Sequence, residues 1–123
     1  MPSNDDLVAA FQDALAGNGD ALVASLAPGA VIWHNHDNSD QTVAQNMKVL
    51  AAMDRFVTDR TYDERRRYLI DGGIVQQHVL RGTRRRDGEP VQLHACVVVS
   101  VKDGRITRLD EYLDSAEVAA FWS

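Results

Sequence analysis

Residues 91–114 read VQLHACVVVSVKDGRITRLDEYLD, and this stretch carries the clearest structural signal in the chain. Two runs rich in apolar and β-branched residues, 91–102 and 105–113, flank Asp103-Gly104, a pair typical of a two-residue hairpin turn. The segment Asp114-Ser115-Ala116-Glu117 that follows has the pattern of a capping box and predicts a short terminal helix. The end of the chain is therefore predicted to be a β-hairpin followed by a helix.

A second hairpin is predicted immediately upstream. The runs 60–70 and 74–85 flank Asp71-Gly72-Gly73, a turn signal of the same kind. The turn Asp87-Gly88-Glu89-Pro90 then leads into the strand that starts at 91. The second half of the chain is therefore predicted to be a four-strand antiparallel meander.

The first half is predicted to be mainly helical. Apolar residues recur with the helical period after a cap at Ser3 or Asn4, and Gly17-Asn18-Gly19 ends this first helix. The other predicted elements are a helix over about 20–26, a strand over 30–35, and a helix from a cap at Ser39 or Asp40 to about Phe56. The order of elements predicts a single α+β domain over 1–123, with helices on one face of a curved antiparallel sheet that encloses a cone-shaped cavity.

Composition excludes several classes of function. The chain has 123 residues, 13 Lys and Arg against 18 Asp and Glu, and a formal charge of −5, so it lacks the basic footprint of a nucleic-acid binder. Arg triplets at 65–67 and 84–86 have no interleaved aromatic residues and are predicted to be solvated or to pair with acidic residues of a partner subunit. The one cysteine, Cys96, has no partner for an internal disulfide and is interpreted as a small buried hydrophobe.

Membrane, secretion and cofactor signals are also missing from the sequence. The longest apolar run, 95–99, is far shorter than the ~20 residues of a transmembrane helix. No signal peptide is visible, so a cytoplasmic protein is expected. We expect no cofactor, because neither a Gly-rich phosphate loop nor a dinucleotide-binding glycine motif is present. His34, His36, Asp37 and Asp40 lie close together, but their spacing does not enforce a metal geometry, so no metal is predicted.

The hairpin 91–113 and Trp33-His34-Asn35 resemble one known group of proteins. The ending DGRIT…EYLD is common in SnoaL-like proteins, and the aromatic-x-Asn pattern looks like that of limonene-epoxide hydrolases. The whole chain resembles the nuclear transport factor 2-like superfamily, which includes these proteins and the ketosteroid isomerases. The resemblance implies a cone-shaped, cystatin-like α+β barrel and a homodimer formed through the outer sheet face. It leaves the activity open, because this fold hosts isomerases, hydrolases, cyclases and non-catalytic binders.

Glu111 is the leading catalytic candidate. Strand alternation places it on one face with Leu109 and Leu113, while Ile106, Arg108, Asp110 and Tyr112 share the other. If the first face lines the cavity, Glu111 is a carboxylate between apolar neighbours, a setting suited to a general acid or base. The resemblance implies the same role, since SnoaL-like cyclases and epoxide hydrolases have an Asp at a similar position. The alternative is a structural glutamate paired with an Arg on a neighbouring strand.

The strand 74–81 offers His78 or Gln77 to the cavity, since these residues lie on opposite faces and neither face is purely apolar. His78 could act as an acid or base near neutral pH, although a lone strand histidine is commonly structural. The epoxide hydrolases have an Arg and an Asp two residues apart in this region. Gln77 with Val79, or His78 with Leu80, does not supply that pair, so epoxide hydrolysis is disfavoured.

Trp33 and Asn35 share a face of the early strand, where Asn35 could hold a water or a substrate oxygen. The alternative is that Trp33 packs in the core and Asn35 ends the strand. Ketosteroid isomerases have a Tyr in the first helix, and Phe11 at the similar position here cannot donate a hydrogen bond. Residues expected to contact substrate are Trp33, Phe11, Gln77, Leu93, Ala95, Leu109, Leu113 and Met47.

Two functions remain open from sequence. The first is an isomerase- or cyclase-type enzyme for a small apolar or polycyclic molecule, in which Glu111 shuttles a proton and Asn35 or His78 holds an oxygen. The second is a non-catalytic small-ligand-binding or dimerisation module that keeps the pocket. A homodimer is expected in both cases, because the late strands carry apolar residues on both faces and His94 is expected to face outward.

Overall fold

The computed structural model describes residues 3–15 and 19–123 and contains one six-stranded sheet with four helices among them. The helices are α1 (Asn4–Leu15), α2 (Gly19–Ser25), α3 (Val43–Phe56) and α4 (Ser115–Phe121). The strands are β1 (Leu26–His34), β2 (Ser39–Gln41), β3 (Val57–Ile70), β4 (Gly73–Arg84), β5 (Pro90–Lys102) and β6 (Arg105–Leu113). The predicted α+β architecture is therefore confirmed, and the predicted turn at Gly17-Asn18-Gly19 lies mainly outside the described residues.

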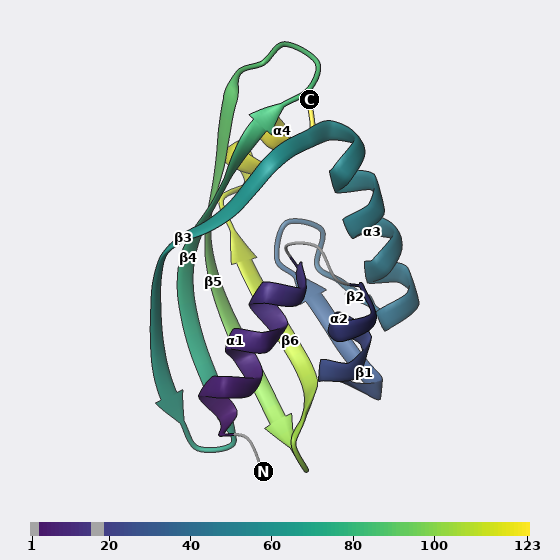
Figure 1. The fold of residues 1–123 in the computed structure, drawn as a ribbon, viewed down its shortest axis with the longest axis vertical. Coiled ribbons are helices and arrows are strands. Elements are labelled where there is room, and N and C mark those ends of the chain that lie inside the picture. Colours follow the sequence, from purple (N-terminus) through teal and green to yellow (C-terminus); the bar gives the residue numbers. More distant parts are fainter. Residues whose placement is uncertain (1–2, 16–18) are drawn as a thin grey trace.

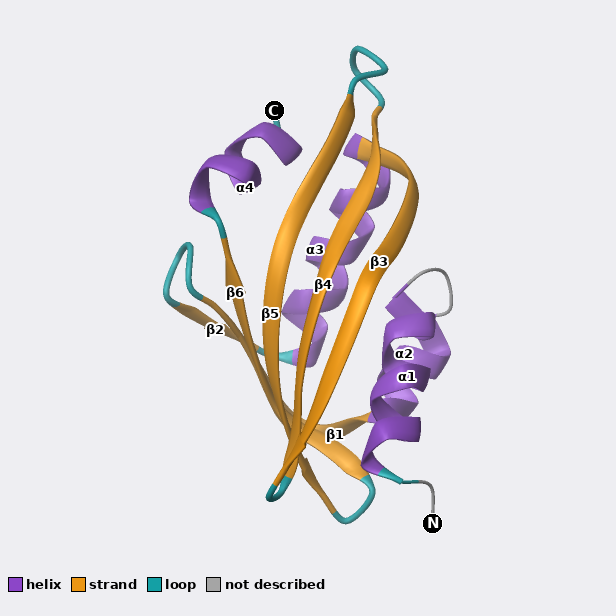
Figure 2. Ribbon diagram, turned by 90° about the vertical axis from the view of Figure 1, so that its left-hand side faces the viewer, coloured by secondary structure: helices purple, strands orange, loops and turns teal. Residues whose placement is uncertain are grey.

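The sheet has the strand order β2-β1-β6-β5-β4-β3. The four long strands β3 to β6 form the predicted antiparallel meander, whereas β1 joins its free edge parallel to β6. The sheet curves, with α1 and α3 against its concave side (Figure 1). In Figure 2, α3 lies behind the sheet and the outer face of β4 and β5 is turned to the viewer.

Two bulges bend β3, the outermost long strand. The register between β3 and β4 shifts between Thr58 and Thr61 and again between Asp63 and Arg66. Asp59 and Glu64, one at each shift, both adopt a positive φ of 54°. Bulges bend a strand and increase its local twist, so these two positions curl β3 over the concave side of the sheet.

Two clusters of buried side chains form the core. The first joins α1 to β1, β4, β5 and β6 and includes Phe11, Ile74 and Val97. The second lies toward α4 and includes Tyr62, Leu93 and Phe121. Side chains of both clusters line one cavity, so the cavity lies between two packed regions of the core.

Several predicted boundaries in the first half are wrong. The predicted strand 30–35 begins earlier, at Leu26, since Pro28 and Gly29 lie inside β1 at a register irregularity. Ser39 and Asp40 belong to the short strand β2, and Thr42 caps α3 instead. The Thr42 hydroxyl accepts from the Gln45 N–H while the Gln45 side chain accepts from the Thr42 N–H, which completes a capping box.

A bulge in β6 overturns one predicted face. Alternation placed Ile106 on the outer face, but its side chain is fully buried in the same cluster as Leu109. The register between β5 and β6 shifts between the pairs Ser100–Arg108 and Val101–Ile106, which turns Ile106 inward. Among the described helices, none is both long and apolar enough to cross a membrane.

Candidate functional site

A cavity of about 320 Å³ lies between the concave face of the sheet and helices α1, α3 and α4. Its walls are mainly apolar and are formed by residues such as Phe11, Leu50, Leu93 and Leu109. Polar side chains in the lining are Gln12, His34, His36, Asp37, Gln41, Asn46, Tyr62, His78 and Glu111. An apolar cavity with a few converging polar groups is the usual form of a small-molecule site.

Glu111 lines this cavity from β6, together with Leu109 and Leu113, as strand alternation predicted. Among the described residues, no arginine pairs with its carboxylate. Instead, Glu111 Oε1 lies 3.2 Å from Nε2 of His34, and the two side chains are 24% and 12% exposed. The parallel pairing of β1 with β6 places His34 directly opposite Glu111 and so creates this contact.

The contact with Glu111 controls the charge of His34. Burial lowers the pKa of His34, but the hydrogen bond to Glu111 and the charges of Glu111 and Asp37 outweigh it, so the pKa is raised above its ordinary value. Nδ1 of His34 is buried without a hydrogen-bond partner in the described part of the chain. The cavity therefore contains a carboxylate and an imidazole within hydrogen-bond distance of each other.

His78 lines the same cavity from β4, but its pKa is shifted in the opposite direction to that of His34. Its side chain is buried, at 4% exposure, and burial lowers its pKa; the nearby positive charge of Arg65 adds to this, while the charge of Glu111 opposes it. Nδ1 of His78 lies 3.0 Å from Nε2 of Gln76. Burial therefore favours the neutral imidazole at His78, whereas the contact with Glu111 favours the charged form of His34.

Tyr62 brings a phenol to the cavity from β3. Burial and the negative charge of Glu111 raise its pKa well above the ordinary value, so the hydroxyl keeps its proton. The rings of Tyr62 and His78 meet edge to face, with centroids 5.2 Å apart. Phe11 also lines the cavity but has no hydroxyl group. Tyr62 on β3 therefore supplies a hydroxyl donor that the first helix lacks.

The structure brings together seven of the residues proposed from sequence. Glu111, His78, Phe11, Leu93, Ala95, Leu109 and Leu113 all line the cavity. Sequence reasoning did not assign His34 or Tyr62 to the site. His34 carried one usable signal, since it shares a strand face with the apolar Ile32, but Val31 and Trp33 make the other face equally apolar.

Four proposed residues lie outside the cavity, and their placement corrects the prediction. Trp33 is on the outer face of β1, where its indole N–H donates to Asn38 and its ring contacts Tyr112. Asn35 bonds through both ends of its amide to the backbone of Leu113, so it extends the β1–β6 pairing and does not line the cavity.

Gln77 and Met47 also lie outside the cavity. Gln77 lies on the outer face of β4, because the inward face of this strand carries Ile74, Gln76 and His78. Met47 packs against the first core cluster, whereas its neighbours on α3 that line the cavity are Asn46, Val49 and Leu50.

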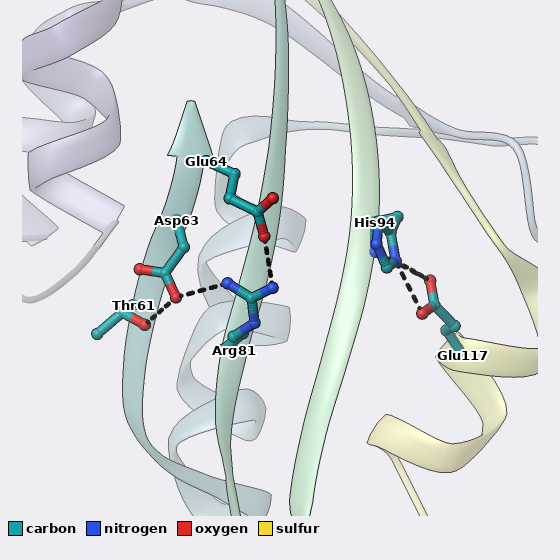
Figure 3. A network of polar contacts seen from close by, with 6 residues as sticks. All are labelled: Thr61, Asp63, Glu64, Arg81, His94 and Glu117. Atoms are coloured by element: carbon teal, nitrogen blue, oxygen red, sulfur yellow. Dashed lines mark hydrogen bonds and ion pairs between the residues drawn. The ribbon is translucent and has the colours of Figure 1, made fainter. Parts of the chain in front are cut away.

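The outer face of the sheet has its own charged contacts. Figure 3 shows Arg81 between Asp63 and Glu64, and His94 beside Glu117. Glu117 accepts from the His94 backbone N–H at 2.9 Å and contacts its ring, so its side chain binds β5, while Asp114 alone caps α4. His94 faces outward as predicted. Among the described residues, no group of three or more His, Cys, Asp or Glu side chains is arranged to hold a metal ion.

The curled sheet, its covering helices and the polar groups in the cavity are typical of small α+β proteins with an internal cavity. Comparison with known proteins identifies the family: the sequence model of the SnoaL-like domain matches residues 5–109, and the chain belongs to this family. The fold is that of the nuclear transport factor 2-like superfamily. A comparison with curated proteins found no significant match.

Solved structures with this fold include two proposed polyketide cyclases. One, from Xanthomonas campestris pv. campestris, is 23% identical, with a TM-score of 0.85 over 98% of this chain and 96% of that one. The other, IdmH from Streptomyces antibioticus, is 20% identical, with a TM-score of 0.87 over 98% of both chains. A protein of ketosteroid isomerase-like fold from Catenulispora acidiphila, solved with trimethylamine, is 18% identical with a TM-score of 0.82 over 96% and 92%.

Proposed function

We propose that this protein is a cofactor-independent enzyme of isomerase or cyclase type that moves a proton on a small, largely apolar carbonyl compound. The observation that carries the proposal is the pairing of Glu111 with His34 inside a mainly apolar cavity. A partly buried carboxylate beside an imidazole can remove and return a proton. The SnoaL-like cyclases and isomerases of the same fold support this class of reaction.

The proposed first step is removal of a proton from a carbon next to a carbonyl group. The Glu111 carboxylate takes the proton, the C–H electron pair forms a carbon–carbon double bond, and the carbonyl π pair moves to the oxygen. The resulting enolate either takes the proton back at another carbon, which is isomerisation, or attacks a second carbonyl carbon, which is aldol cyclisation. In both cases Glu111, or His34 through it, returns a proton to the product.

Apolar walls support this step because they exclude water and strengthen interactions with the developing negative charge. Tyr62 and His78 both offer donors in the cavity, since the phenol and the imidazole are held in their neutral forms. Neither group adds a second negative charge beside the enolate.

The first prediction concerns Glu111→Gln. We expect it to abolish exchange of the acidic protons of 2-tetralone in deuterated buffer, measured by NMR, because an amide cannot accept the proton. Ligand affinity and the unfolding midpoint should change little, since the amide has nearly the same shape as the carboxylate. The matched control is Glu117→Gln, which changes a carboxylate outside the cavity. Wild-type exchange that persists in Glu111→Gln would contradict the proposed role.

A non-catalytic ligand-binding module is the second candidate. It is favoured by Phe11, which places an apolar ring where ketosteroid isomerases have a hydroxyl. In this case the wild-type protein would bind apolar ketones without accelerating exchange in any of them, and Glu111→Gln would leave their affinity unchanged.

A further inference from the structure

A buried chain of hydrogen bonds connects the cavity to the protein surface through β3 and β4. Nε of Arg67 donates to Oε1 of Gln76 at 2.7 Å, and Nε2 of Gln76 lies 3.0 Å from Nδ1 of His78. Gln76 is fully buried and His78 is 4% exposed. Arg67 was predicted to be solvated with its triplet, yet its side chain is only 23% exposed and its outer end lies 3.5 Å from Asp5.

The direction of each hydrogen bond in this chain follows from chemistry. A guanidinium can only donate, so the Gln76 atom that faces Arg67 must be the carbonyl oxygen. The amide nitrogen of Gln76 therefore faces His78, and an amide nitrogen can only donate. Nδ1 of His78 must accept, which leaves the single proton of the neutral imidazole on Nε2.

We propose that Gln76, held by Arg67, is a positioning residue that keeps His78 as an Nε2–H donor for the carbonyl oxygen of the substrate. This inference rests on the proposed function, and it assigns the oxygen-binding role to His78 and the proton-transfer role to Glu111. Within the described residues, Nε2 of His78 has no hydrogen-bond partner, although the ring lines the cavity. An enolisable ketone is the class of substrate that needs both a base and such a donor.

The neutral state of His78 suits this role. Burial and Arg65 hold its pKa below the ordinary value, so the ring donates one hydrogen bond without carrying a full charge. The other charged group that acts on His78 is Glu111, which opposes this shift. Without Gln76, neutral His78 could carry its proton on either ring nitrogen. Nε2 would then act as a donor in only part of the protein molecules.

The decisive variant is Gln76→Glu, with Gln77→Glu as the matched control on the opposite face of the same strand. At about pH 8, where a ring of ordinary pKa is neutral, the new carboxylate should accept from both Arg67 and His78 and move the histidine proton to Nδ1. Long-range ¹H–¹⁵N correlation spectra identify the protonated nitrogen, and His78→Gln assigns its signals. We expect an Nε2–H ring in the wild type and in Gln77→Glu, and an Nδ1–H ring in Gln76→Glu.

The same variants test the consequence for catalysis. With 2-tetralone, Gln76→Glu should lower kcat about 100-fold, as removal of one oxyanion donor does, while KM changes little and Gln77→Glu behaves as the wild type. If Gln76→Glu does not fold, Arg67→Ala frees the Gln76 amide and should give a mixture of histidine tautomers, whereas Asp5→Asn should not.

Three results would overturn the inference. They are an Nδ1–H ring in the wild type, an unchanged ring in Gln76→Glu, and a switched ring without loss of kcat. The spectra need no turnover, so a protein that fails to exchange 2-tetralone protons contradicts the proposed function but leaves the positioning of His78 by Gln76 independently measurable.

Discussion

His34 and His78 share one cavity but respond to it in opposite ways. Both rings are desolvated, which disfavours the charged form. His34 contacts the carboxylate of Glu111 directly, and that contact reverses the effect of burial on its pKa. His78 instead accepts from an amide and has only the more distant attraction of Glu111, so burial prevails. The same cavity therefore favours the charged form of one imidazole and the neutral form of the other.

The opposite shifts predict opposite effects of pH on stability. The pKa of His34 is raised in the folded protein, so its stabilisation is fully present below the unfolded value of 6.5 and is lost as pH rises through the folded value. Urea unfolding should therefore show that His34→Asn destabilises the protein more at about pH 6 than at about pH 9. A penalty that grows with rising pH would contradict the assignment of His34.

The contrast between Glu111 and Asn35 shows which site residues the sequence could predict. Glu111 lies between Leu109 and Leu113 on a strand that follows a clear hairpin signal, so alternation alone gave its face. Asn35 ends a strand with apolar residues on both faces, and its partner strand is 78 residues away. Pairing of β1 with β6 decides which face turns inward, and local periodicity contains no information about that pairing.

At the scale of elements, bulges and close backbone contacts set the shape that encloses the site. The hairpins could be predicted because their turn residues are local signals. Strand β2 could not, because Ser39–Gln41 is short and lacks β-branched or aromatic residues. The bulges in β3 and β6 were also hidden, since an inserted residue reverses the alternation on which face predictions depend. Ile106 shows the result, because one bulge moved it from the predicted outer face into the core.

Gly73 offers a test of how closely β4 and β5 approach. A Cβ atom at Gly73 would overlap the backbone carbonyl oxygen of Val99, which flexible side chains cannot relieve. Gly73→Ala should therefore lower the free energy of unfolding by about 1–3 kcal/mol, in the range of overpacking substitutions, as measured by urea titration. Gly29→Ala is the control, since nothing lies within 4 Å of its added Cβ. Equal stability of the two variants would show that the approach of β4 to β5 is looser than the structure has it.

Charge is unevenly distributed along the chain. Residues 1–47 contain six Asp and no Lys or Arg, while all thirteen basic residues follow. Opposite charges meet where α1 packs against β3. Asp5 lies within ion-pair distance of Arg67, and Asp13 lies within ion-pair distance of Arg65. Exposed pairs of this kind contribute little individually to stability. The Asp5 contact is made by the outer end of the Arg67 side chain, while Nε of Arg67 donates to Gln76.

The outer face of the sheet is partly apolar, which bears on how the protein assembles. Val75, Cys96 and Val98 form a half-buried apolar strip on this face, and Tyr112 beside them is 49% exposed. We propose that a second copy of the chain covers this face, because a sheet that is apolar on both sides must bury both. A two-fold contact would pair the strip with itself.

Analytical ultracentrifugation tests this arrangement. We expect a species of twice the 13.6 kDa chain mass for the wild type. Val98→Arg should shift it to the monomer, because a dimer would then bury two like charges close together at its centre. Leu69→Arg is the control, since Leu69 is 71% exposed beside the β3–β4 turn, away from the strip. A monomeric wild type, or a Val98→Arg protein that remains dimeric, would show that this face is not the interface. Loss of the dimer without loss of 2-tetralone exchange would further show that each protomer holds a complete site.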